Sequence, residues 1–177
     1  MNNIKIFVIG SNSFSGASFV DFALNKGFLV SGISRSPLPN NVFLPFSNNN
    51  LNVKNFKFYQ LDLNKNLDDI IKVIKNEEPQ FIFNFAAQSM VAESWIYPEH
   101  WYITNAVSTT ALFNKLKDFK FLKKYVHVTT PEVYGSCSGF ISEDKSYNPS
   151  TPYAASRAAG DMSLKTFVDN YDFPAVS

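Results

Sequence analysis

The chain has 177 residues, of which 45% are hydrophobic and 18% are charged, and its formal net charge is +1. This length suits one domain with its own core, and a nearly neutral chain gives no electrostatic reason to expect a nucleic acid or an anionic membrane as partner. Because Cys137 is the single cysteine, no intramolecular disulfide can form. The N-terminal apolar run is too short for a signal peptide or a membrane span, so we expect a cytoplasmic protein.

Apolar runs and amphipathic segments alternate along the chain. The first run, IKIFVIG (residues 4–10), is nearly continuous and β-branched, which is typical of a strand buried on both faces. Further strands are predicted at residues 28–34, 56–63, 81–87 and 124–130, and helices at 15–26, 67–79, 98–118 and 152–171. The Asn- and Pro-rich stretch 37–52 is predicted to be a loop. This alternation predicts an α/β fold, a Rossmann-like doubly wound parallel sheet flanked by helices.

The segment GSNSFSG (residues 10–16) follows the first predicted strand and opens the first helix. A strand that turns directly into a helix offers free backbone N–H groups and the positive end of the helix dipole to a pyrophosphate. Small residues at Gly10, Ser13 and Gly16 would let phosphates approach the backbone, with Phe14 between them. Because the middle glycine of a G-x-x-G-x-x-G pattern is a serine here, a simple tight turn is the alternative to the dinucleotide site that we expect.

The ends of the second and third strands are predicted to bind the adenosine part of a dinucleotide. In such folds a carboxylate there binds the ribose hydroxyls of NAD, whereas an arginine accommodates the extra phosphate of NADP. This chain has Ser34 and Arg35 and no carboxylate, which favours NADP unless Arg35 merely solvates the strand end. Asp62, followed by Leu63, is placed to bind the adenine amino group, or else to cap the turn.

Small and polar residues follow the fourth and fifth predicted strands. In NFAAQSMVAES the residues expected to contact cofactor or substrate beyond the strand end are Ala86, Ala87, Gln88 and Ser89. The fifth strand ends in TTPEVYG, where Thr130 supplies a hydroxyl and Glu132 a carboxylate. Both strand ends are therefore candidates for the site.

Tyr153 and Arg157 are four residues apart in TPYAASRAAG, so they share one face of the predicted helix. A tyrosine phenol has an unperturbed pKa of about 10 and is a poor base near neutral pH. A fixed cation nearby favours the phenolate and lowers that pKa. With Thr130 bonded to the same substrate oxygen, the pair could remove a proton from an alcohol while a nicotinamide accepts the hydride.

Together, IKIFVIGSNSFSG, NFAAQSMVAES, TTPEVYG and TPYAASRAAG resemble the extended short-chain dehydrogenase/reductases, in the NAD-dependent epimerase/dehydratase branch. The resemblance covers essentially the whole chain, and within the branch it is strongest to nucleotide-sugar 4,6-dehydratases of the dTDP-glucose and GDP-mannose types. It implies an enzyme that uses NAD or NADP to oxidise the fourth carbon of a nucleotide sugar, eliminate water and return the hydride. It also implies a homodimer formed through the helices near residues 98–118 and 152–171.

The resemblance implies roles by position. Tyr153 would take the proton of the sugar 4-hydroxyl, Thr130 would bond the same oxygen, and Arg157 would hold the nicotinamide ribose. Glu132 matches the carboxylate with which dehydratases remove the proton of the fifth sugar carbon. Asn105, in WYITNAVST, matches a helix asparagine common in the family and is expected to bind substrate.

Several features depart from the family's pattern. The family's lysine is Arg157 here, and arginine is bulkier and forks its donors. Pro131 stands where the dTDP-glucose enzymes have a proton-donating aspartic acid, and Ser13 replaces the middle loop glycine. The family's C-terminal substrate-binding part is absent, and the final stretch resembles a sixth strand that stops at once. We therefore interpret residues 1–177 as one dinucleotide-binding domain that would turn over substrate poorly by itself.

Other functions stay open. A nucleotide-sugar 4-epimerase or 4-keto reductase needs only the tyrosine, threonine and basic residue, whereas Glu132 favours a dehydratase. A catalytically silent dinucleotide-binding scaffold is the alternative from another class. No metal site is expected, because His100, His127 and Cys137 do not form a cluster of ligands in the chain. His127 is interpreted as a core histidine with its hydrogen bonds satisfied.

Overall fold

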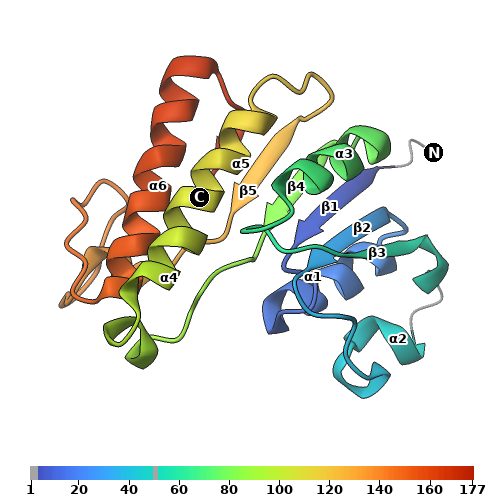
Figure 1. Ribbon diagram of the computed structural model, residues 1–177, viewed down its shortest axis with the longest axis horizontal. Helices are drawn as coiled ribbons and strands as arrows, with labels where there is room; N and C mark the ends of the chain where they lie inside the picture. Colours follow the sequence, from blue (N-terminus) through green and yellow to red (C-terminus); the bar gives the residue numbers. More distant parts are fainter. Residues whose placement is uncertain (1–3, 50–51) are drawn as a thin grey trace.

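The computed structural model, which describes residues 4–49 and 52–177, contains one six-stranded parallel sheet (Figure 1). Its strands are β1 (Lys5–Ile9), β2 (Leu29–Ser34), β3 (Phe56–Gln60), β4 (Phe81–Asn84), β5 (Lys124–His127) and β6 (Ala175–Val176). They lie in the order β3-β2-β1-β4-β5-β6, so the strand order reverses beside β1. This order confirms the predicted Rossmann-like doubly wound fold.

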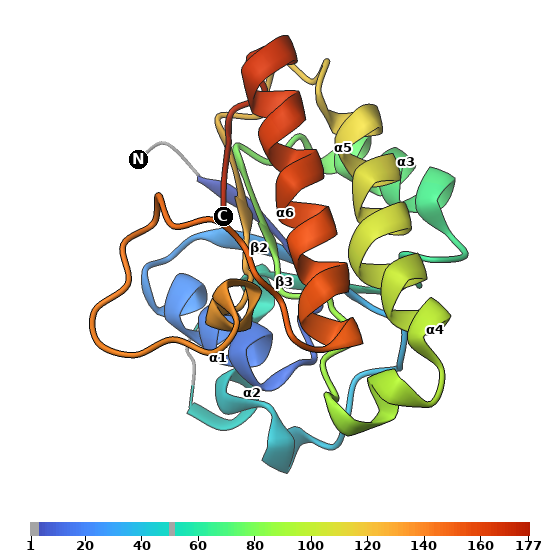
Figure 2. The ribbon, with the colours of Figure 1, turned by 90° about the vertical axis from the view of Figure 1, so that its left-hand side faces the viewer.

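Helices cover both faces of the sheet. They are α1 (Phe14–Asn25), α2 (Pro45–Asn49), α3 (Leu67–Glu77), α4 (Pro98–Tyr102), α5 (Thr109–Leu116) and α6 (Pro152–Tyr171). Figure 2 shows α6 beside the helix that α4 and α5 form together, with α1 and α2 in another part of the molecule. No helix in the described ranges is both long and apolar enough to cross a membrane.

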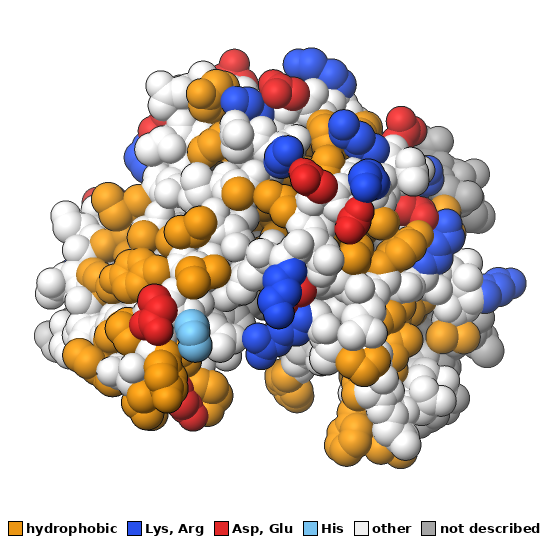
Figure 3. Space-filling view, viewed as in Figure 1, with side chains coloured by type: hydrophobic (Ala, Val, Ile, Leu, Met, Phe, Trp, Pro, Cys, Tyr) orange, Lys and Arg blue, Asp and Glu red, His pale blue; other side chains and the backbone are white. Residues whose placement is uncertain are grey.

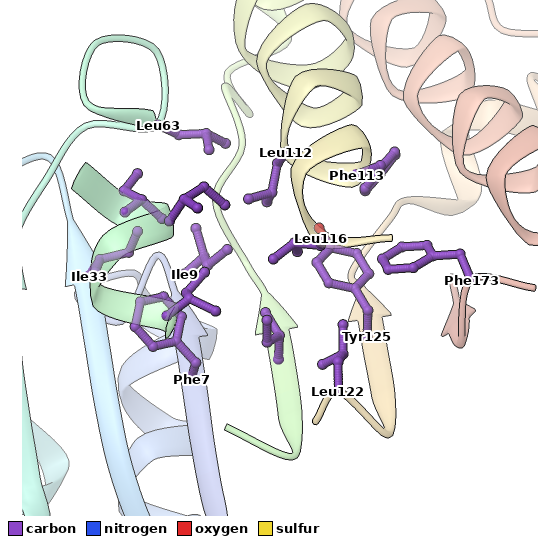
Figure 4. Close-up of a cluster of buried hydrophobic side chains, with 14 of the residues drawn as sticks. Phe7, Ile9, Ile33, Leu63, Leu112, Phe113, Leu116, Leu122, Tyr125 and Phe173 are labelled. Carbon is purple, nitrogen blue, oxygen red and sulfur yellow. The ribbon is translucent and has the colours of Figure 1, made fainter. Parts of the chain in front are cut away.

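The alternation of side chains along β1 divides the core into two clusters. Ile6 and Val8 pack with α1 and α2 on one face, whereas Phe7 and Ile9 pack with α3, α5 and α6 on the other (Figure 4). All four side chains are nearly or completely buried. The apolar run at residues 4–10 thus forms a strand that is buried on both faces, as predicted.

Three strands end earlier than the sequence pattern predicted. They stop at Gln60, Asn84 and His127 rather than at residues 63, 87 and 130. At β4 the cause is visible, because the Asn84 side chain accepts a hydrogen bond from the Ala86 N–H at 2.9 Å. The residues after each strand are thereby free to leave the sheet and surround a pocket.

The stretch predicted as a loop at residues 37–52 contains a short 3-10 turn (Asn41–Phe43) and α2. Burial explains the difference, since Leu44 and Phe46 are only 4% and 2% exposed and pack in the core cluster of α1. Residues 50 and 51 lie outside the described ranges. Two buried apolar residues are therefore enough to order part of this Asn-rich stretch.

The helix predicted over residues 98–118 is continuous but not uniform. A π-helical segment, Ile103–Ser108, joins α4 to α5, and the Thr109 hydroxyl donates to the Thr104 carbonyl at 2.9 Å. Such π-helical turns are rare and frequently occur at functional sites. This one contains Asn105, whose contacts are described below.

Candidate functional site

A pocket of about 270 Å³ opens at the carboxyl ends of β1, β2, β3 and β4. This is the position beside the reversal of strand order where open α/β sheets bind ligands. Its walls bring together many of the residues predicted to bind a cofactor: Gly10, Ser13, Ser34, Arg35, Asp62, Leu63, Ala86, Ala87 and Gln88. Phe14 and Gly16 lie on the adjoining first turn of α1, and Tyr153 and Arg157 lie outside the pocket wall.

The loop between β1 and α1 requires glycine at two positions. Gly10 has a φ of 82°, and a Cβ there would lie 2.7 Å from the Ala86 nitrogen, so β1 and β4 meet backbone to backbone. A Cβ on Gly16 would lie 2.2 Å from the Gly10 carbonyl oxygen. Both glycines allow the N-terminus of α1 to approach the pocket. The Phe14 side chain at the same turn is 92% exposed.

Ser13 fits this loop without strain, because its φ is −69°. Its hydroxyl donates to the Gly10 carbonyl at 2.8 Å and accepts from the Gly16 N–H at 3.0 Å. The serine therefore acts as the N-cap of α1 and occupies an N–H group that an anion could otherwise bind. A serine instead of a glycine at position 13 therefore has a physical consequence, because its hydroxyl already accepts the hydrogen bond of the Gly16 N–H.

We expect Ser13→Gly to raise the affinity for a dinucleotide several-fold, because the change frees the Gly16 N–H for a phosphate. Replacing an N-cap serine by glycine costs a few tenths of a kcal/mol, whereas Ser13→Ala should cost about 1 kcal/mol of stability. Calorimetric titration and urea unfolding of the three proteins measure both effects. Unchanged affinity in Ser13→Gly would show that the loop does not bind the phosphates.

Hydrogen bonds hold the backbone of the residues that follow β2, while the Arg35 side chain there is exposed. The Asn12 N–H donates to Ser34 Oγ at 2.9 Å, and Asn12 Nδ2 donates to the Ser36 carbonyl at 3.2 Å. The Arg35 carbonyl accepts from Gln60 Nε2 at 3.3 Å. The Arg35 guanidinium is exposed and has no ion pair or hydrogen bond to the described part of the chain. It can therefore turn towards a ligand in the pocket.

At the end of β3, Asp62 caps the turn, because its Oδ1 accepts from the Asn64 N–H at 2.9 Å. This confirms the turn-capping alternative, and a contact to adenine stays a prediction for the same carboxylate, which lines the pocket. Leu63 is 7% exposed and belongs both to the pocket wall and to a core cluster. The floor of the pocket is thus continuous with the core.

Asn105 does not lie where it could contact a substrate, because it is completely buried. Its Oδ1 accepts from the Gln88 N–H, and its Nδ2 donates to the Gln88 carbonyl and to Ser156 Oγ, each at 2.9 Å. A Cβ on Gly160 would lie 2.4 Å from the Asn105 carbonyl oxygen, so α6 and the π segment are in close contact. The structure therefore differs from the expected substrate contact: Asn105 fixes the pocket wall to α6. Ser89, the residue after Gln88, is exposed.

The predicted catalytic residues lie around the ends of β5 and α6. Tyr153 is 9% exposed, and Thr130, 8% exposed, accepts from the Glu132 N–H at 3.3 Å and begins the 3-10 turn Pro131–Tyr134. Thr130 lines a second cavity of about 810 Å³, between that turn and α6. Glu132 is exposed on the turn and, like Tyr153, lines neither cavity. The structure thus does not bring Glu132 and Tyr153 into one pocket.

Arg157 lies in a buried polar cluster that sequence reasoning did not identify. It is 2% exposed, and its Nη2 donates to the Val128 carbonyl. Asp161, one helical turn later, accepts from the Thr129 hydroxyl, and burial raises the pKa of this carboxyl. Burial lowers the pKa of the Arg157 guanidinium, while the negative charge of Asp161 opposes that effect. The only sequence signal for this cluster is the i, i+4 spacing of the two charges.

His127 is the last residue of β5 and is 1% exposed, which confirms a core position. Its hydrogen bonds are not satisfied as expected, because neither ring nitrogen has a partner in the described residues. Asp161 Oδ1 is 3.7 Å from Nε2, which is too long for a hydrogen bond. Burial, with the nearby Arg157 charge, lowers the pKa of His127 to about 3.

We expect His127 to make the free energy of unfolding fall by about 2 kcal/mol between pH 7 and pH 5. The unfolded imidazole binds a proton below about pH 6.5, whereas the buried one stays neutral until about pH 3, so acid favours the unfolded chain. Asp161, whose pKa is raised, acts in the opposite direction as pH falls. Urea unfolding of the wild type and His127→Phe at both pH values isolates the histidine. Equal pH dependence in the two proteins would contradict the assignment.

Comparison with known proteins places this geometry in a family. The chain matches the family described as GDP-mannose 4,6 dehydratase over residues 7–177. It is 30% identical over 179 residues to an uncharacterized protein of Schizosaccharomyces pombe, covering 93% of this chain and 49% of that protein. It is 28% identical over 183 residues to dTDP-glucose 4,6-dehydratase of Xanthomonas campestris pv. campestris, strain B100, and this match covers 96% of this chain and 50% of that protein.

A solved structure shares the same arrangement. UDP-glucuronic acid 4-epimerase from Bacillus cereus, in complex with UDP-glucuronic acid and NAD, is 28% identical with a TM-score of 0.81, and the match covers 98% of this chain and 55% of that chain. The chain spans about half the length of the curated relatives it matches. The family match over residues 7–177 spans nearly all of the sheet, the loop before α1, and the helix α6 with Tyr153 and Arg157. The chain therefore belongs to the NAD-dependent epimerase/dehydratase family, in the group described as GDP-mannose 4,6 dehydratase.

Proposed function

We propose that this chain is the dinucleotide-binding half of a nucleotide-sugar 4,6-dehydratase or a close relative. The observation that carries the proposal is the pocket at the reversal of strand order, into which the Gly10–Gly16 loop and the N-terminus of α1 open. The two glycines let this loop, the residues after β4 and the first turn of α1 pack closely, which brings the N-terminus of α1 beside the pocket. A bound dinucleotide would supply the hydride acceptor and donor. The substrate-binding part would lie outside residues 1–177, as the length of the relatives supports.

Within this proposal, Tyr153 exchanges a proton with the sugar 4-hydroxyl, and Thr130 bonds the same oxygen. Both side chains belong to segments that meet at the carboxyl end of β5. Glu132 would remove the proton of the fifth sugar carbon, and its exposed position on the turn after β5 leaves it free to reach a substrate. Pro131 has no proton to donate, so the leaving water would need another donor.

A 4-epimerase is the second candidate. The Bacillus cereus relative, which is 28% identical, is a 4-epimerase, and that reaction needs no residue in the role of Glu132. Incubating the full-length protein with dTDP-glucose, GDP-mannose and UDP-glucuronic acid separates the candidates. A 4-keto-6-deoxy product supports the dehydratase, and a 4-epimer supports the alternative. Bound dinucleotide without any product would favour a silent scaffold.

We further propose NADP rather than NAD as the preferred cofactor. Among the described residues that line the pocket, Arg35 is the one arginine or lysine, its guanidinium has no ion pair or hydrogen bond to them, and no carboxylate directly follows β2. A charge-assisted contact to the 2′-phosphate should favour NADP⁺ over NAD⁺ by about tenfold or more. A carboxylate, which would bind the ribose hydroxyls of NAD, is missing at this position.

Calorimetric titration of the chain with NAD⁺ and NADP⁺ tests this preference. Arg35→Gln should abolish the preference for NADP⁺ and leave the binding of NAD⁺ nearly unchanged. Lys120→Gln removes one positive charge from an exposed residue that lines neither cavity, so it should leave the preference intact. Tighter binding of NAD⁺ by the wild type would refute the role of Arg35.

A homodimer and a cytoplasmic location complete the proposal. Exposed apolar side chains lie on and beside α4, the π segment and α6, namely Trp95, Ile96, Tyr97, Ile103, Val107 and Met162. Figure 3 shows hydrophobic side chains gathered on the side of the molecule where α4 and α6 lie. Such a patch is typical of an interface between subunits. Sedimentation equilibrium of the wild type and Val107→Glu tests the dimer, since a buried charge at the interface should give monomers.

A further inference from the structure

Arg157 is enclosed by the protein, although the family resemblance assigns its position to the nicotinamide ribose. The residue is 2% exposed, and its Nη2 donates to the Val128 carbonyl just beyond β5. Its Nε and Nη1 are also buried and have no hydrogen-bond partner in the described chain. The guanidinium therefore presents almost no donor to a ligand in the space outside α6.

The charge of Arg157 lies inside the protein, in the field of an opposite charge. A buried charge is costly unless an opposite charge or hydrogen bonds compensate it. Asp161 is buried on the next turn of α6, and its negative charge favours the charged form of the guanidinium. Tyr125 and His127 of β5 lie in the same polar cluster, within electrostatic reach of Arg157. The groups around Arg157 all belong to β5, α6 and the residues after β5, not to the pocket.

The pocket itself is built for one half of a dinucleotide. Its walls come from the loop after β1, from the ends of β2, β3 and β4, and from Thr104 in the π segment. These are the positions that hold phosphates and an adenosine in such folds. Neither Tyr153 nor Arg157 lines the pocket. The pocket thus offers groups for the adenosine diphosphate half and no cation from α6 for the other ribose.

We propose that Arg157 is a structural cation of the core, and that this chain holds a dinucleotide by its adenosine diphosphate half, without a contact from position 157 to the nicotinamide ribose. The inference rests on the proposed dinucleotide site and adds which half of the ligand provides the affinity. It assigns Asp161 the role of the opposite charge that favours the charged form of the buried guanidinium.

Calorimetric titration of the folded 177-residue chain tests the inference with two matched pairs of ligands, NAD⁺ with ADP and NADP⁺ with 2′,5′-ADP. We expect the dissociation constants within each pair to agree within about threefold, because a ribose contact worth one charge-assisted hydrogen bond would separate them by about tenfold or more. Arg157→Met should leave these ratios unchanged and lower the midpoint of thermal unfolding. This change in stability is the readout of a structural role.

Each outcome decides between the two proposals. A dinucleotide that binds at least tenfold more tightly than its half, with the difference lost in Arg157→Met, would show that Arg157 does hold the ribose. If Arg157→Met does not fold, the wild-type ratio decides alone. Equal binding within each pair supports the inference and leaves the proposed function standing. If no ligand binds the folded chain, as checked by circular dichroism, the dinucleotide site itself fails and the inference fails with it.

Discussion

Replacing Gly160 by valine should destabilise the protein by about 3 kcal/mol and weaken dinucleotide binding. A Cβ at this position would lie 2.4 Å from the Asn105 carbonyl oxygen, which is backbone and cannot rotate away. The π segment would have to move from α6, and the Asn105 side chain would lose its hydrogen bond to Ser156. Because the same side chain holds both backbone groups of Gln88, the pocket wall would move as well.

Two further variants separate this clash from helix propensity. Alanine normally stabilises a helix interior by about 1 kcal/mol relative to glycine, so a destabilised Gly160→Ala would demonstrate the contact. Thr166→Val, on the exposed side of α6, should change stability by less than about 0.5 kcal/mol. Urea unfolding and calorimetric titration measure both effects. A Gly160→Val protein with wild-type stability would mean that α6 and the π segment are not in close contact.

The fold could be predicted because its signals are local. A β-branched run at residues 4–10 that is buried on both faces requires a central strand, and the confirmed sheet order follows from strands that alternate with helices. Gly10 and Gly16 were identified as positions where phosphates could approach the backbone, and the structure shows that they also allow close contact between backbone segments of the chain. The ends of the strands were not predictable, because they depend on particular bonds such as the one between the Asn84 side chain and the Ala86 N–H.

The surroundings of α6 could not be predicted from spacing. The i, i+4 pattern placed Tyr153 and Arg157 on one helix face, but whether that face meets solvent, ligand or β5 depends on tertiary packing. The structure shows a close contact at Gly160, and with it Asn105 and Arg157 become buried. Two residues expected to touch ligands thus make internal contacts. Sequence motifs identify the chemistry of a side chain, but not the direction in which packing turns it.

Tyr153→Phe should lower kcat of the full-length protein on its nucleotide sugar by about 10²–10⁴-fold, the usual contribution of a positioned general acid or base. The change removes one hydroxyl and keeps the ring that packs at the start of α6, where the side chain is 9% exposed. Dinucleotide affinity should therefore stay within about twofold, since Tyr153 does not line the pocket. Loss of kcat with retained cofactor binding would be specific to the proton-transfer role.

Tyr171→Phe is the matched control, because it removes the same hydroxyl from the far end of α6, where the side chain is 54% exposed. Its kcat should equal that of the wild type. A Tyr153→Phe protein that keeps more than about a tenth of wild-type kcat would exclude Tyr153 as the base, since the loss would fall below the range of general-base catalysis. A full-length wild type that binds the dinucleotide but converts no nucleotide sugar would instead favour the silent scaffold, in which Arg157 stabilises α6 and Tyr153 has no reaction to serve.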